Sequence, residues 1–122
     1  MKKRILSMLL ALVMLATLLP TNAFAVASND YTQWRQSDPE WNQAEAWPAS
    51  QYPNASMRWM RNAGCLVTSV AMLLRHYGVV TTTDVNSFNP WICNNALKAA
   101  GAFTSAADMY WDGVKKAYPG FV

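Results

Sequence analysis

The fold is decided by the stretch Asn62-Ala63-Gly64-Cys65-Leu66-Val67-Thr68-Ser69-Val70-Ala71-Met72-Leu73-Leu74-Arg75-His76-Tyr77-Gly78. It consists of a small-residue turn, a cysteine and a largely apolar segment that ends at a glycine. At helical spacing the apolar residues cover most of the circumference, and four residues form a stripe that reaches solvent: Thr68, Met72, Arg75 and His76. We therefore expect a central helix buried on several sides, with Gly78 as the left-handed residue that ends it.

Cys65 is placed where a thiol becomes a nucleophile. The free N–H groups and the positive dipole end at a helix N-terminus favour the thiolate form. We expect Gly64 to leave the approach to the sulfur open, and the Cys65 backbone N–H to serve as an oxyanion-hole donor. The alternative is a small buried hydrophobic residue, which is a common role for free cysteine. Residue type and spacing alone leave both interpretations open.

Two further helices are expected after this one. Asn89 is a good N-cap before Pro90 at the first helical position, and this second helix ends at Gly101. Ser105 with Asp108 fits a capping box that opens a third helix. That helix is expected to run to Tyr118-Pro119-Gly120 and to bury four residues: Tyr110, Trp111, Val114 and Ala117.

The first 25 residues have the pattern of a secretory signal peptide, of bacterial type. Lys2, Lys3 and Arg4 precede an apolar run from Ile5 to Leu19, and Ala23-Phe24-Ala25 is a small-x-small cleavage site. The apolar run is shorter than the roughly 20 residues that span a bilayer. We expect cleavage after Ala25, a secreted or cell-surface protein, and no stable membrane anchor in the mature chain 26–122.

The net charge of the mature chain excludes one class of partner. The formal charge of +3 comes from ten Lys and Arg against seven Asp and Glu. The three basic residues of the signal segment account for all of the excess, so residues 26–122 are formally neutral. A neutral domain without a basic patch is not expected to bind nucleic acid. A single histidine and no closely spaced cysteine pair also predict no metal site, and no glycine-rich loop or other motif predicts a cofactor.

Residues 26–56 are expected to form an irregular arm, because Pro39, Pro48 and Pro53 prevent a long helix or a central strand. Asp38-Pro39 is an expected turn, as is Tyr52-Pro53-Asn54. The tryptophans of the arm and the following segment favour packing onto the rest of the chain, although they also suggest a groove for cell-wall glycans: Trp34, Trp41, Trp47 and Trp59.

Two segments together resemble the opening of a secreted papain-like cysteine peptidase of the bacteriocin-processing-peptidase-like family. Gln36-Ser37-Asp38-Pro39-Glu40-Trp41 is similar to a Q-x-D-x-x-W arm. Gly64 to Met72 is similar to a G-C-x-x-T-S-x-A-M helix start. The similarity covers about residues 31–78.

The resemblance implies an α+β fold of which this chain holds the mostly α-helical N-terminal part, residues 26–122, with the β half apparently missing. It implies Cys65 as nucleophile and Gln36 as the oxyanion-hole partner of the Cys65 N–H. Asp38 and Trp41 are expected to hold the arm in place. The strand-like Phe121-Val122 at the end also suggests a truncated chain.

The resemblance further requires a histidine as general base, and the chain has only His76. Eleven residues separate it from Cys65, which is about 16 Å along a helix axis. A general base must lie within about 3 Å of its proton, or one water away. His76 therefore cannot serve Cys65 in an unbroken helix, and we expect little or no peptidase activity from this chain alone, whose substrate class would be peptides or proteins.

Three alternatives stay open. Cys93 shares a helical face with Leu97 and Ala100, which indicates a buried thiol, but a Cys65–Cys93 disulfide is possible in an oxidising compartment. The three functions that stay open for the chain are therefore a cysteine peptidase-like domain, a non-catalytic module that binds peptide or cell-wall material, and a disulfide-linked structural domain.

Overall fold

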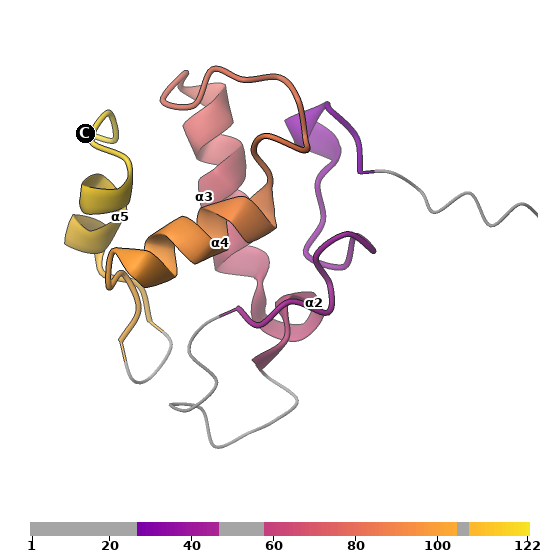
Figure 1. Ribbon diagram of the computed structural model, residues 1–122, viewed down its shortest axis with the longest axis horizontal. Coiled ribbons are helices and arrows are strands. Elements are labelled where there is room, and N and C mark those ends of the chain that lie inside the picture. The colour runs from indigo at the N-terminus through magenta and orange to yellow at the C-terminus, as the bar shows by residue number, and fades with distance from the viewer. Residues whose placement is uncertain (1–26, 47–57, 105–107) are drawn as a thin grey trace, which may run out of the picture.

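The computed structural model describes residues 27–46, 58–104 and 108–122. This part of the chain is mostly helical (Figure 1), with five elements along the sequence. They are η1 (Tyr31–Gln33), α2 (Met60–Ala63), α3 (Cys65–His76), α4 (Pro90–Ala99) and α5 (Trp111–Ala117). Its only strand-like pairings are two isolated bridges, Glu45 with Trp59 and Phe103 with Met109.

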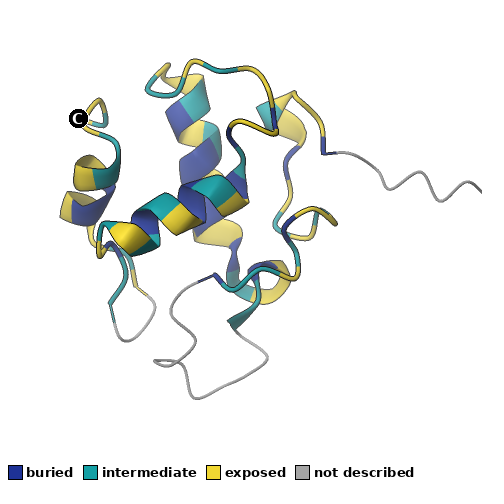
Figure 2. Cartoon of the chain, in the orientation of Figure 1, coloured by how far each residue is buried: buried dark blue, intermediate teal, exposed yellow. Residues whose placement is uncertain are grey.

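The core forms where α4 runs across α3, and α5 packs against α4 near the C-terminal end of that helix (Figure 1). The buried positions of α3 and α4 meet near this crossing in Figure 2. α3 contributes Val67, Val70, Ala71 and Leu74, and α4 contributes Cys93 and Leu97. Since each helix buries one stripe of apolar residues against its neighbour, the crossing lies at the centre of the core, to which the arm and α5 add further buried residues.

The central helix is confirmed, but the expectation that it is buried on several sides is wrong. Leu66, Leu73 and Tyr77 are 40%, 43% and 73% exposed, while Thr68, which was expected on the solvent stripe, is buried. Only α2, α4 and η1 contact α3 closely among the described elements, so one apolar side of it stays open.

The caps of α3 and α4 agree with the sequence. Gly78 has φ of +69°, the left-handed conformation that ends α3. Asn89 caps α4, with its side-chain oxygen accepting a hydrogen bond from the Ile92 N–H at 2.9 Å. Pro90 is the first residue of α4, and Gly101 ends it with φ of +68°.

The predicted start of the last helix is wrong. Ser105 lies outside the described residues, but Asp108 to Tyr110 are not helical, and α5 begins at Trp111. Met109 instead pairs with Phe103 in one of the two bridges, and the Tyr110 N–H donates to the Ala102 carbonyl at 2.7 Å. This pairing takes up backbone groups that a helix starting earlier would have needed.

Two of the four residues expected in the last helix's buried face are not buried. Tyr110 is 56% and Trp111 is 50% exposed, whereas Val114 is fully buried and Ala117 is partly buried. α5 approaches so closely at Gly113 that a Cβ there would lie 2.4 Å from the Ala102 Cα. Close backbone contact, rather than the two aromatic rings, therefore fixes α5 on the core.

Residues 27–46, the described part of the expected arm, have no regular element besides η1, as expected. The turn at Asp38-Pro39 is closed by the Trp41 N–H, which donates to the Asp38 carbonyl at 3.1 Å. Trp34 and Trp41 are 4% and 1% exposed, so these two rings pack into the core. Trp47 and the turn expected at Tyr52-Pro53-Asn54 lie outside the described residues.

Candidate functional site

Cys65 is the first residue of α3 and is exposed to solvent. Gly64 both ends α2 and precedes α3, so the chain passes from one helix to the next through a single residue. The interpretation of Cys65 as a buried hydrophobic residue is therefore wrong. The first N–H groups of a helix have no partner within it, and Cys65 stands at that end of α3.

Gly64 has a different role from the one that the sequence indicated. It is buried, and a Cβ there would lie 2.5 Å from the Met60 carbonyl oxygen and 2.9 Å from the Met60 sulfur. A glycine is needed here because this position lies directly against the backbone and the side chain of Met60, the first residue of α2. The open approach to the sulfur comes from the exposure of Cys65 itself.

Gln36 reaches the turn that precedes Cys65, although 29 positions separate the two residues in the sequence. Its side-chain Nε2 donates to the Arg61 carbonyl at 2.7 Å. Arg61 lies four residues before Cys65, so in a continuous helix that carbonyl would accept the Cys65 N–H. The structure thus brings the Gln36 amide and the head of α3 into one neighbourhood.

The arm that carries Gln36 is held by its own hydrogen bonds. The Asp38 carboxylate accepts the Arg35 N–H at 2.9 Å, and the buried Trp41 ring donates its N–H to the Arg35 carbonyl at 2.8 Å. The Arg61 N–H donates to the Asn42 carbonyl at 3.2 Å, which ties the same arm to α2. Asp38 and Trp41 have the holding role that the sequence predicted.

His76 is the last residue of α3, and the helix between it and Cys65 is unbroken. The expected separation of about 16 Å along the axis therefore applies. The ring Nδ1 of His76 instead lies 3.1 Å from the Tyr31 hydroxyl. The chain has no other histidine, so no imidazole is available to Cys65 from within it.

Cys93 is a fully buried thiol on α4, as its helical face predicted. Burial raises the pKa of Cys93 from 9.0 to about 12, and a hydrogen bond with Tyr118 opposes part of that shift. Burial also raises the pKa of Tyr118, which the nearby thiol raises further. Both cysteines are free, which does not favour the disulfide-linked alternative.

The described tryptophans of the arm and the following segment pack against the chain, as the sequence favoured over a glycan groove. Trp34 and Trp41 are buried, and Trp59 is partly buried beneath the guanidinium groups of Arg58 and Arg61, at 5.0 and 5.6 Å from its ring centre. Such cation–π contacts stabilise the fold. The rings that the structure describes in this set serve packing.

A shallow hollow along α3 was missed from the sequence. It has a volume of about 440 Å³ and is lined by Tyr31, Ser69, Met72, Leu73, His76 and Tyr77. Leu66, Leu73 and Tyr77 recur at spacings of seven and four, which is one face of a helix. That regular spacing was the available signal of a second apolar face.

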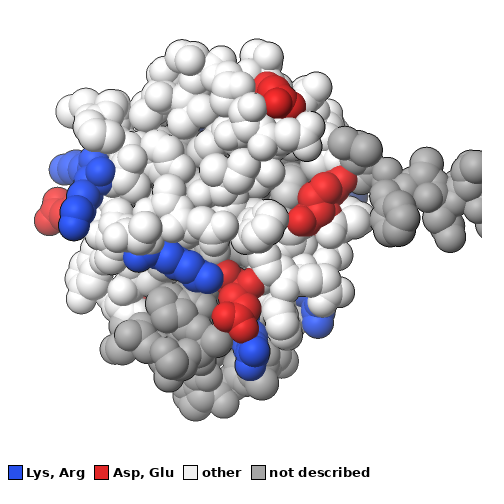
Figure 3. All heavy atoms as spheres, viewed as in Figure 1, with Lys and Arg blue, Asp and Glu red and all other residues white. Residues whose placement is uncertain are grey.

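On the face in Figure 3, basic and acidic residues are scattered among uncharged ones. Within ranges 27–46, 58–104 and 108–122, no cluster of three or more His, Cys, Asp or Glu could hold a metal ion. No helix in these ranges is both long and apolar enough to cross a bilayer.

The comparisons with known proteins add no assignment. The chain matches no protein-family model, and no curated protein or solved structure matches it either.

Proposed function

We propose that this chain is the nucleophile-bearing helical part of a secreted, papain-like cysteine peptidase, with Cys65 as nucleophile and Gln36 as oxyanion donor. One observation carries the proposal: an exposed thiol begins α3, and the Gln36 amide is hydrogen-bonded one helical turn before it. A thiolate at a helix N-terminus is suited to attack a carbonyl carbon. An amide donor beside it is suited to stabilise the oxyanion that results.

In the full reaction the Cys65 sulfur would attack a peptide carbonyl, and the carbonyl oxygen would take the negative charge. The Cys65 N–H and the Gln36 amide would stabilise that charge. A histidine would protonate the leaving amine, and water would release the acyl group from the sulfur. Because His76 is too far from Cys65, we expect this chain alone to accept an acyl group but not to cleave a peptide bond.

Acylation can be tested without the missing base if the leaving group needs no protonation. With p-nitrophenyl acetate, the Cys65 thiolate forms a bond to the acetyl carbon, and p-nitrophenolate departs with the electron pair of the broken C–O bond. Mass spectrometry of the intact protein would show one acetyl group, located on Cys65. The buried Cys93 provides an internal control, since it should stay unmodified in the folded protein.

Gln36→Ala separates an oxyanion role from a structural one. Removal of an oxyanion donor costs about 10²–10³ in rate in mature enzymes, and we expect a loss of at least about tenfold in acetylation here. Alkylation by iodoacetamide forms no oxyanion, so its rate at Cys65 should stay within about twofold. Gln33→Ala is the matched control, since Gln33 is an exposed glutamine that donates to Thr32. Equal losses in both reactions would contradict the oxyanion role.

The hollow along α3 favours a second candidate, a non-catalytic module that binds an extended peptide with apolar side chains. Leu73 in its lining offers the apolar contact, with Leu66 exposed on the same face of α3, and the Tyr31 and His76 side chains that line it offer hydrogen bonds. Binding of a fluorescent apolar peptide that Leu73→Ser weakens and Cys65→Ser does not would support this candidate. Absence of the Cys65 acetylation described above would remove the peptidase proposal and leave this one.

A further inference from the structure

The hollow along α3 lies on the same side of the helix as Cys65. Ser69, Met72 and His76 line it. Together with Cys65 they are spaced by four, three and four residues, which places all four on one face of α3. The Ser69 hydroxyl donates to the Cys65 carbonyl at 2.8 Å, so the hollow begins one helical turn after Cys65. A chain that is bonded to the Cys65 sulfur and follows α3 therefore passes into the hollow.

The far end of the hollow is bounded by contacts that hold η1 on α3. The Tyr31 hydroxyl lies 3.1 Å from the His76 Nδ1, and the Tyr77 ring stands edge-on to the His76 ring with 4.9 Å between the ring centres. The Arg75 guanidinium lies 5.5 Å from the centre of the Tyr31 ring, in a cation–π contact that helps to hold this ring in place. This wall limits how far a group bound in the hollow extends along the helix.

The lining suits an aliphatic chain better than a peptide backbone. Met72 and Leu73 provide apolar contact, and the described residues that line the hollow include no Asp, Glu, Lys or Arg. The Ser69 and Tyr31 hydroxyls are already hydrogen-bonded within the chain. Each peptide unit brings an N–H and a C=O that need partners when they are buried. An aliphatic chain needs none, and its transfer from water to an apolar lining is favourable.

The positions along α3 set the length of chain that fits. Met72 and His76 follow Cys65 by seven and eleven residues, which is about 10 and 16 Å along the helix axis. A zigzag aliphatic chain with C–C bonds of about 1.5 Å advances roughly 1.25 Å per carbon. A chain of about 8–12 carbons on the sulfur therefore extends roughly 10–15 Å and ends before the wall at His76.

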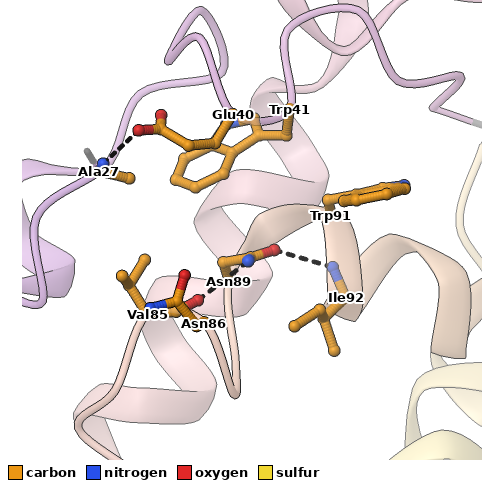
Figure 4. Close-up of a pocket in the computed structure, with 8 residues that line it drawn as sticks. All are labelled: Ala27, Glu40, Trp41, Val85, Asn86, Asn89, Trp91 and Ile92. Carbon is orange, nitrogen blue, oxygen red and sulfur yellow. Dashed lines mark hydrogen bonds between the residues drawn. The ribbon is translucent and has the colours of Figure 1, made fainter. Parts of the chain in front are cut away.

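A separate cavity, drawn in Figure 4, does not share this relation to Cys65. It has a volume of about 250 Å³, and Glu40, Asn89 and Ile92 are among the residues that line it. No residue of α3 is among its described lining. The Glu40 carboxylate accepts the Ala27 N–H, and the Asn89 side chain accepts the Ile92 N–H at 2.9 Å. Of these two spaces, the hollow is therefore the one that a group on Cys65 can enter.

We propose that the hollow holds an unbranched aliphatic chain carried by Cys65, so that Cys65 takes acyl groups of about 8–12 carbons in preference to short ones. The donor is an aliphatic acyl ester or thioester, whose leaving group departs without the missing base. This inference rests on the acylation of Cys65 in the proposed function and extends its substrate class beyond peptides. The chain is selected by its length and by apolar contact with Met72 and Leu73.

The test is a series of p-nitrophenyl esters of acetic, hexanoic, decanoic and hexadecanoic acid, applied to the full chain below the concentration at which each ester aggregates. In each reaction the Cys65 sulfur bonds to the acyl carbon, p-nitrophenolate departs with the electron pair of the C–O bond, and the thiol proton passes to solvent. Division by the rate with N-acetylcysteine corrects for the reactivity of each ester. We expect the decanoate to acylate Cys65 at least about tenfold faster than the acetate. The hexadecanoate should gain nothing further, because the far wall bounds the hollow.

Two matched variants separate the hollow from general stickiness of α3. Leu73 and Leu66 are 43% and 40% exposed on the same helix, and only Leu73 of the two lines the hollow. Leu73→Ser should lower the ratio of the decanoate rate to the acetate rate at least about fivefold, whereas Leu66→Ser should leave it within about twofold. Gln36→Ala should slow both esters and leave their ratio unchanged, since the oxyanion is the same in each.

Three results would overturn the proposal. They are corrected rates that do not depend on chain length, a chain-length preference that Leu73→Ser retains, or an equal loss of preference in Leu73→Ser and Leu66→Ser. In each of these cases Cys65 is still acetylated, so the proposed function stands. A failure of the proposed function differs, because no ester of the series, the acetate included, would then acylate Cys65, and the aliphatic preference would fall with it.

Discussion

At the scale of single residues, the head of α3 depends on a glycine whose neighbours are close. Gly64 leaves no space for a side chain, because its Cβ position is 2.5 Å from a backbone oxygen of Met60. Cys65, directly after it, is exposed, and Gln36 reaches the same turn from the arm. Gly64 therefore makes the site possible by its lack of a side chain, although it takes no part in the chemistry.

Gly64→Ala should destabilise the protein and disturb the site. A methyl group would press on the Met60 backbone, which cannot move aside as a flexible side chain can, and such overpacking costs about 1–3 kcal/mol. Urea unfolding would measure the loss in free energy of unfolding. Gly120→Ala is the matched control, since its Cβ would meet the Val79 side chain at 3.3 Å. Similar stabilities for the two variants would show that α2 can adjust.

At the scale of elements, α4 joins the core to the cavity drawn in Figure 4, which Trp91 and Ile92 of its first turn help to line. Its N-cap, Asn89, accepts from the Ile92 N–H at 2.9 Å and donates to the Val85 carbonyl at 2.9 Å. One side chain therefore starts the helix and also fixes the preceding turn, beside the cavity of Figure 4. The local sequence Asn-Pro predicts this cap, because both of its partners lie within four residues.

Asn89→Ala should lower the free energy of unfolding by about 1–2 kcal/mol, because it removes both hydrogen bonds and leaves an uncapped N–H in the first turn. Chemical denaturation followed by circular dichroism would measure it. Asn95→Ala, on the exposed face of the same helix, replaces a poor helix former by a good one and should be neutral or slightly stabilising. An Asn89→Ala variant as stable as Asn95→Ala would contradict the capping role.

At the scale of the whole molecule, a buried thiol and a phenol join α4 to the end of α5. Cys93 is fully buried, and Tyr118 is the residue that directly follows α5. Burial raises the pKa of Cys93 to about 12 and that of Tyr118 as well. Both groups are therefore neutral in the folded protein at pH values where the unfolded chain already ionises them.

Stability should fall as pH rises above about 9, where the unfolded chain begins to lose these protons and the folded protein keeps them. Below that pH the contribution is complete, and it is lost toward about pH 12, where Cys93 ionises in the folded state. Each group adds a slope of at most about 1.4 kcal/mol per pH unit. Urea unfolding at pH 7, 9, 10 and 11 should show a shallower decline for Cys93→Ala.

The control for that decline is Val114→Ala, a fully buried substitution without an ionisable group. It should lower stability by a similar amount at every pH and leave the slope as in the wild type. A slope that Cys93→Ala leaves unchanged would mean that other groups cause the alkaline loss.

The sequence by itself determined the features that depend on near neighbours. It determined that the described chain is mostly helical, that Gly78 ends the central helix, that Asn89-Pro90 starts the next one, and that Asp38-Pro39 is a turn. Each depends on backbone preferences or on hydrogen bonds within a few residues. The resemblance also named Gln36 and Cys65 as one pair, although nothing local links them.

Only the tertiary structure decided the rest, because it depends on which segments meet. The side of α3 that stays open is set by where α4, α2 and η1 contact it, so Leu66 and Leu73 are exposed while the polar Thr68 is buried. The start of α5 is set by the backbone hydrogen bonds of Tyr110 with Ala102 and of Thr104 with Asp108, which overrode a local capping pattern at Ser105 and Asp108. The hydrogen bond from Gln36 to Arg61 and the cavity beside Glu40 likewise depend on segments that are far apart in the chain. The order of residues along the chain does not predict which of these segments come into contact.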